Sequence, residues 1–191
     1  SSQSRGLGDV YKRQILGSIP LVIVGYIFYS TNLIDQFRNL KVVAWTTLIF
    51  GILLYFSDKF ELKNKISSEL NIKSIIIIGL FQILAIIPGV SRSGIVITAS
   101  RFLKFDRVES SKIAFYLSIP ALAGASVLGF KDVIDDQINF DAIFIFSTSA
   151  SFLFSYFTIK YFLIYVKMFS LSFFVIYRIV LSIILFSIIY L

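Results

Sequence analysis

The chain has 191 residues, of which 57% are hydrophobic and only 15% are charged, and it contains 21 phenylalanines and 10 tyrosines. A soluble domain of this size cannot bury that much apolar surface, so the composition indicates a protein that lies in a lipid bilayer. The 18 basic against 11 acidic residues then indicate charged loops at one membrane face and argue against nucleic-acid binding. Because the chain has no cysteine and no histidine, disulfides, thiolate metal sites and a histidine general base are excluded.

Residues 1–14 differ from the rest of the chain. They are polar, lack helical periodicity and lead into Ile15 without a capping residue. They do not form a signal peptide, because Lys12 and Arg13 directly precede a segment long enough to cross a membrane. We interpret 1–14 as a non-native or disordered N-terminal tail and 15–191 as a single membrane domain.

Apolar segments follow one another along the whole membrane domain. Five of them approach the length that crosses a hydrocarbon core of about 30 Å. They lie at about 15–30, 42–57, 111–130, 142–165 and 172–190. Two further segments, 74–87 and 95–103, reach only about 21 Å and 14 Å as helices and are too short to cross singly.

Loop charges decide whether these two short segments form one broken crossing or a re-entrant hairpin. The loops 58–73 and 101–112 each carry four basic residues, whereas 131–141 carries four aspartates and one lysine. A single crossing would place the two basic loops on opposite faces, but a hairpin places both on the cytoplasmic face. The charges favour the hairpin and predict an all-α polytopic membrane protein with about five transmembrane helices plus one re-entrant helix-loop-helix.

The sequence also contains an internal echo. Ser18-Ile19-Pro20 recurs one hundred residues later as Ser118-Ile119-Pro120, and a glycine follows soon after each copy, at Gly25 and Gly124. Chance in a chain rich in isoleucine and serine is the alternative to a duplication. In a duplicated chain, the counterpart of Pro88 would precede residue 1, so we expect an N-terminally truncated fragment that lacks its first re-entrant half-site.

Residues 88–98, between the two short segments, are the candidate site. Arg92 would be costly in hydrocarbon without a partner or an anionic ligand. Gly89 and Gly94 allow the backbone to approach a ligand closely, and Ser91 and Ser93 add hydroxyl donors. A helix that starts near Gly94 would direct free N–H groups at the loop, so the segment predicts a phosphate-type anion site.

Three polar residues have plainer interpretations as well. Arg92 could instead tie down loop carbonyls. Gln82 lies in a half-helix, where a glutamine more often joins helices than touches substrate. Arg178, in the last apolar segment, has no glycine-rich loop beside it, and we favour a structural hydrogen bond or snorkelling for it.

The loop reads Pro88-Gly89-Val90-Ser91-Arg92-Ser93-Gly94, with Gln82 before it and Leu117-Ser118-Ile119-Pro120 after it. This motif resembles that of the undecaprenyl-diphosphate phosphatase family, the bacitracin-resistance membrane enzymes. The likeness covers nearly all of 15–191 and includes Tyr177-Arg178. It implies an inverted-repeat architecture in a bacterial inner (plasma) membrane. It also implies removal of the terminal phosphate of undecaprenyl diphosphate, which yields the lipid carrier of peptidoglycan synthesis.

The resemblance implies roles for the residues of the loop and for two partners. Arg92, Ser91 and Ser93 would be catalytic, and Gly89, Gly94 and Gln82 would bind substrate. The family's other half-site is a glutamate-rich motif followed by Ser-Ser-Thr-Gly-His, to which nothing in this chain corresponds. A divalent cation, Mg or Ca, is therefore expected in the intact enzyme, with its ligands missing from this chain. The family's usual threonine is replaced by Val96, and Thr98 faces elsewhere on a helix.

The expected partners are a polyprenyl diphosphate lipid and the surrounding membrane lipids, with no nucleic acid; a homodimer is left open. We expect the fragment to be inactive alone, because it offers anion binding without an evident nucleophile or cation ligands. The alternative function is a lipid flippase or a secondary transporter with an anion-binding broken helix.

Overall fold

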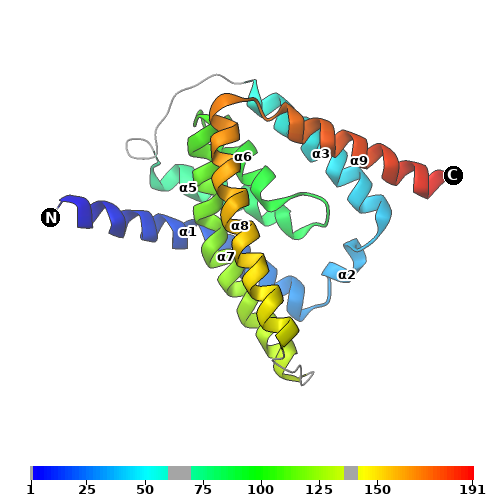
Figure 1. Cartoon of the computed structure of the whole chain (residues 1–191), viewed down its shortest axis with the longest axis horizontal. Helices are drawn as coiled ribbons and strands as arrows, with labels where there is room; N and C mark the ends of the chain where they lie inside the picture. The colour runs from blue at the N-terminus through cyan, green and yellow to red at the C-terminus, as the bar shows by residue number, and fades with distance from the viewer. Residues whose placement is uncertain (1, 60–69, 136–141) are drawn as a thin grey trace.

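The structure is a computed structural model that describes residues 2–59, 70–135 and 142–191, and every regular element in these ranges is helical (Figure 1). The elements are α1 (Ser2–Ser30), α2 (Ile34–Phe37), α3 (Leu40–Asp58), α5 (Ile72–Ile83), the 3-10 turn η1 (Leu84–Ile86), α6 (Arg92–Phe102), α7 (Arg107–Asp135), α8 (Ala142–Met168) and α9 (Ser172–Tyr190). The predicted all-α fold class is confirmed.

Four of the described helices are long and apolar enough to cross a membrane, namely α1 from Gly8 onward, α3, α8 and α9. They correspond to four of the five expected spans. The fifth, 111–130, lies within α7, which has 29 residues and is thus about 43 Å long. Its charged first turns and Pro120 lower its apolar character, although its length suffices to cross the hydrocarbon core.

Residues 2–14 are helical in the structure and form the first half of α1; that 1–14 is a non-native tail stays a prediction. A contact with α7 anchors this segment, since the buried Gln14 donates through Nε2 to the carbonyl of Tyr116. Pro120 has no N–H, which leaves the carbonyl four residues before it without a helical donor. Gln14 supplies that donor from a residue that the sequence analysis had set aside.

The segments 74–87 and 95–103 form the predicted helix-loop-helix. The chain runs through α5 and η1, turns at 87–91 and folds back as α6, which packs against α5 (Figure 1). At the end of α6, Arg101 Nη2 donates to the carbonyl of Asp58 at 2.9 Å, so α3 and α6 finish at the same end of the molecule. The two basic loops therefore begin side by side, as the hairpin requires.

The two copies of the internal echo meet where α1, α5 and α7 cross. Ser18 Oγ lies 3.5 Å from the carbonyl of Leu117, and a Cβ at Gly17 would lie 2.7 Å from the Leu117 side chain. A Cβ at Gly79 of α5 would overlap the carbonyl of Gly17. Glycine at both positions permits this close backbone approach, which places the hairpin against α1 and α7.

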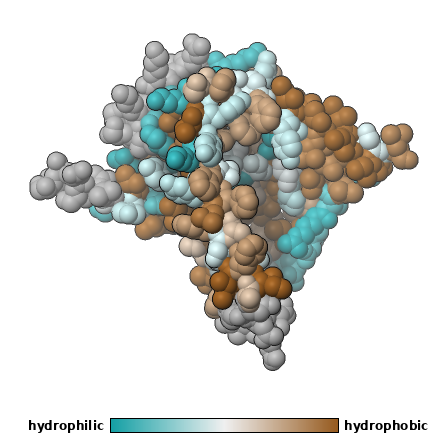
Figure 2. All heavy atoms as spheres, in the orientation of Figure 1, coloured by the Kyte–Doolittle hydropathy of each residue, from teal (hydrophilic) through white to brown (hydrophobic). Residues whose placement is uncertain are grey.

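A second close pair is formed by α3 and α9. The buried positions of α3 repeat at intervals of three and four, which is the spacing of one helix face. They are Ala44, Thr47, Gly51, Leu54 and, at the end of the helix, the adjacent Ser57 and Asp58. Val175, Arg178 and Ser182 are the buried face of α9, and Ser182 Oγ donates to the carbonyl of Ala44 at 3.0 Å. The outer surface of this pair is strongly hydrophobic (Figure 2), which suits contact with lipid.

Candidate anion site

The loop of the hairpin lies on α3 in a conformation that glycine makes possible. Gly89 has φ +89°, and a Cβ there would overlap Thr46 Oγ1 and lie 2.8 Å from the carbonyl of Val43. Thr46 Oγ1 donates to the carbonyl of Pro88 at 2.7 Å, and Thr47 Oγ1 lies 3.4 Å from that of Gly89. The loop is thus fixed to α3 through its own carbonyl groups.

Arg178 holds the same loop from α9. This residue is 8% exposed. Its Nη2 donates to the carbonyl of Gly89 at 2.8 Å and to the carbonyl of Val90 at 3.3 Å. Its Nε donates to the carbonyl of Thr47 at 3.3 Å. Gly51 leaves room for the arginine, because a Cβ there would lie 3.2 Å from Arg178 Cβ. The structural hydrogen-bonding interpretation of Arg178 is confirmed.

Helix α6 starts directly after the loop and directs its N-terminus at the site. Ser91, with φ 62°, is the N-cap residue, and its Oγ accepts a hydrogen bond from the N–H of Gly94 at 3.3 Å. The N–H groups of Arg92 and Ser93 belong to the first helical turn, which has no intrahelical acceptors. The helix dipole and these free N–H groups favour an anion at this point.

A cavity of about 420 Å³ opens beside this helix N-terminus. Its lining combines loop residues with apolar side chains from α3, α6, α8 and α9. The lining residues are Val43, Thr47, Leu54, Gly89, Ser91, Ser93, Gly94, Ile97, Phe162, Leu171, Phe174, Tyr177, Arg178 and Leu181. Arg178 Nη1 makes no hydrogen bond to any residue that the structure describes, so one side of the guanidinium can still donate to a ligand.

Four of the six predicted site residues therefore lie at one cavity, namely Gly89, Ser91, Ser93 and Gly94. Arg92 and Gln82 do not line it. Arg92 is half-buried, and its Nη1 donates to the carbonyl of Ser118 in α7 at 3.3 Å. Gln82 is fully buried in α5, and its amide has no hydrogen-bond partner in the described part of the chain. The roles assigned to these residues stay predictions.

Arg178 joins the site although the sequence analysis left it outside. The signal that could have revealed it is an arginine within an apolar segment, which is costly at membrane depth without a partner. Val96, at the usual threonine position, is fully buried and does not line the cavity. A hydroxyl there would face the protein core in this structure. Thr98 Oγ1 donates to the carbonyl of Gly94 at 2.8 Å, so it too is directed away from a ligand.

No metal site can be assigned among the residues that the structure describes. Among the described residues there is no group of three or more Asp, Glu, His or Cys side chains that could hold one. The divalent cation expected in the intact enzyme stays a prediction.

Comparison with known proteins agrees with the loop motif. A family model described as "Bacitracin resistance protein BacA" matches residues 6–184. Undecaprenyl-diphosphatase of Pelagibacter ubique is 59% identical over 177 residues, which are 92% of this chain and 69% of that protein. The undecaprenyl-diphosphatase of Elusimicrobium minutum is 42% identical over 178 residues, 93% of this chain and 67% of that protein.

A more distant relative extends the same pattern. The undecaprenyl-diphosphatase of Thermobifida fusca is 34% identical over 175 residues, covering 92% of this chain and 60% of that protein. The family match begins within the segment 1–14 and continues almost to the end of the last helix. The chain therefore belongs to the bacitracin resistance protein BacA family.

Proposed function

We propose that this chain acts in the hydrolysis of undecaprenyl diphosphate to undecaprenyl phosphate, in the inner membrane of a bacterium. The observation that carries the proposal is the amphiphilic cavity. One side has the α6 N-terminus, Ser91, Ser93 and the free side of Arg178, and the other side is apolar. A lipid with an anionic headgroup and a hydrocarbon tail matches both sides.

The polar side would bind the diphosphate group. The N–H groups of Arg92 and Ser93, the hydroxyl of Ser93 and Arg178 Nη1 are donors that a phosphate oxygen can accept from. Such donors, fixed before the reaction, stabilise the charge that gathers on phosphoryl oxygens during transfer. Phe162, Phe174 and Leu181 line the apolar side, against which the polyprenyl tail would lie.

Arg92 can take part from the neighbouring face of the loop. Its only hydrogen bond within the described residues is the one from Nη1 to the carbonyl of Ser118. A guanidinium has five N–H donors, so most of them remain available to a phosphate that bridges the α6 N-terminus. We retain Arg92 as a catalytic candidate on this ground.

The proposal is tested by phosphate release from undecaprenyl diphosphate in proteoliposomes. They would contain either the chain alone or the chain together with the part of the Pelagibacter protein that it does not match. We expect binding without release by the chain alone and release by the combination. Arg92→Ala should lower release by about 10²- to 10³-fold, the usual cost of one oxyanion donor. Arg92→Lys should restore little, because an ammonium cannot make a bidentate contact with phosphate.

Lys73→Ala serves as the control, because this exposed lysine lies in the first turn of α5, away from the loop. Near-normal release by both Arg92 variants would remove Arg92 from the site. A flippase or transporter would instead move labelled lipid between leaflets without releasing phosphate, and the names of the relatives do not favour that alternative. Homodimer formation stays a prediction, which the mass of the protein in detergent would test.

A further inference from the structure

The carboxylate at the end of α3 joins helices that form the walls of the cavity. Asp58 is 6% exposed. Arg107, at the start of α7, donates to both of its oxygens, with Nε 2.6 Å from Oδ1 and Nη2 3.1 Å from Oδ2. This bidentate ion pair is the strongest type of hydrogen-bonded contact between charged side chains, and it fixes the position of the carboxylate.

The same carboxylate caps α9. Leu171 is the N-cap residue of α9 and has no side-chain cap of its own, but its N–H donates to Asp58 Oδ2 at 3.0 Å. A carboxylate at a helix N-terminus satisfies a free N–H and interacts favourably with the helix dipole. Asp58 therefore provides from α3 the acceptor for the Leu171 N–H, beside the local contact in which Ser170 Oγ accepts from the N–H of Ser172 at 3.4 Å.

Helix α6 is held at the same point. Arg101, which is 3% exposed, donates through Nη2 to the backbone carbonyl of Asp58 at 2.9 Å and through Nη1 to that of Phe105 at 2.9 Å. Its Nε lies 3.9 Å from Asp58 Oδ1. The C-terminus of α6 is thus tied to the same residue that caps α9, while the N-terminus of α6 faces the cavity.

The position of Arg178 depends on how α9 lies along α3. Arg178 follows Leu171 by seven residues, which is two helical turns and about 10.5 Å. A slide of α9 by one residue would move Arg178 by about 1.5 Å, which would lengthen or misalign its 2.8 Å bond to the carbonyl of Gly89 and so weaken it. Gly51 opposes Arg178 and offers no side chain to block such a slide.

We propose that Asp58 is a positioning residue of the anion site, which acts by capping α9 so that Arg178 meets the loop and the cavity together. This inference rests on the proposed function, because it concerns binding of the diphosphate lipid at that site. Asp58 touches no ligand, and its effect passes through Leu171 and α9 to Arg178.

The experiment compares Leu171→Pro with Leu171→Ala in the full chain in nanodiscs. Both variants lose the leucine side chain, but only proline removes the N–H that Asp58 accepts, and the φ of −76° at this position suits proline. The probes are undecaprenyl diphosphate and the neutral polyprenol of the same chain length. Loss of one charge-assisted hydrogen bond predicts an affinity for the diphosphate about tenfold weaker in Leu171→Pro than in Leu171→Ala.

Affinity for the neutral polyprenol should be the same in the two variants, since the proposed effect concerns only the anion site. Asp58→Asn, which removes the charge but keeps the shape, should show the same selective loss. Equal diphosphate affinity in the two Leu171 variants, or equal loss for diphosphate and polyprenol, would overturn the inference. The proposed function fails differently, namely if the unmodified chain binds undecaprenyl diphosphate no better than the polyprenol.

Discussion

Replacing Gly89 by alanine should separate the hairpin loop from α3. The residue has φ +89°, where a side chain costs about 1–3 kcal/mol in backbone strain. The new Cβ would also overlap Thr46 Oγ1 and lie 2.8 Å from the carbonyl of Val43. A helix carbonyl cannot move aside as a flexible side chain can, so the loop must shift.

The shift would break the hydrogen bond from Arg178 Nη2 to the carbonyl of Gly89, which, as a bond to a charged group, is worth about 1.5–3 kcal/mol. Together the two effects predict a loss of about 2.5–6 kcal/mol. If this loss destabilises the conformation of the loop that binds the ligand, the affinity for undecaprenyl diphosphate should drop by at least about 50-fold.

Fluorescence offers an assay of stability. Trp45, the single tryptophan, packs edge-on against Phe186 of α9 at 5.0 Å between ring centroids, so its emission reports separation of α3 from α9 on heating. Lipid binding is measured on the same samples. Gly25→Ala is the control, because a Cβ there meets nothing within 4 Å and should stabilise its helix by about 0.5–1 kcal/mol. A Gly89→Ala protein as stable as the control, with unchanged affinity, would refute this account of the loop.

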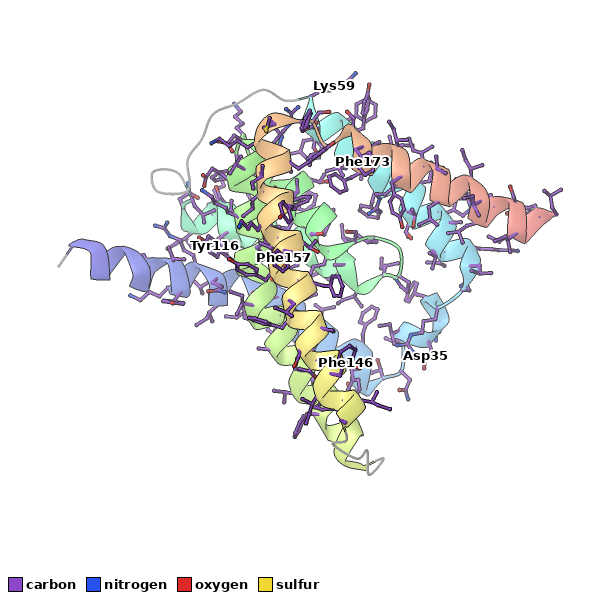
Figure 3. The ribbon with its side chains drawn as sticks, in the orientation of Figure 1. Asp35, Lys59, Tyr116, Phe146, Phe157 and Phe173 are labelled. Atoms are coloured by element: carbon purple, nitrogen blue, oxygen red, sulfur yellow. The ribbon has the colours of Figure 1, made fainter. Side chains whose placement is uncertain are left out.

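Two further predictions concern topology and α1. The chain has no native cysteine, so cysteines can be introduced singly at Lys59, Lys104 and Asp35. The cysteines at Lys59 and Lys104 should be labelled from one side of the membrane and the one at Asp35, in α2, from the other, because Lys59 and Asp35 lie beyond opposite ends of α3 (Figure 3). Labelling of the two lysine positions from opposite sides would contradict the hairpin. Gln14→Leu should destabilise the protein by about 1–3 kcal/mol by leaving the Tyr116 carbonyl unpaired, and an unchanged melting temperature in detergent would show that α1 before Ile15 does not contribute to the fold.

The hairpin and its loop could be predicted because both depend on local sequence. Segments too short to cross, the glycines of the loop and the charges of the flanking loops are readable without knowledge of distant contacts. The helical state of 2–14 could not be predicted, for the opposite reason. Its anchor is the carbonyl that Pro120 leaves without a donor, and the residue that satisfies it, Gln14, lies more than one hundred positions earlier. No periodicity within 1–14 reports such a contact.

Arg178 shows the same limit at the site itself. The pattern of α9 identifies an arginine that needs a partner at membrane depth, but its acceptors are the carbonyls of Thr47, Gly89 and Val90, which have no side-chain signature. The sequence does contain the two glycines that leave room for this contact. Gly51 admits the arginine stem, and Gly89 brings the loop backbone within reach. A glycine of α3, a glycine of the hairpin loop and an arginine of α9 therefore form one site. The acceptors of the arginine are backbone atoms, so the contact is recognisable only in three dimensions.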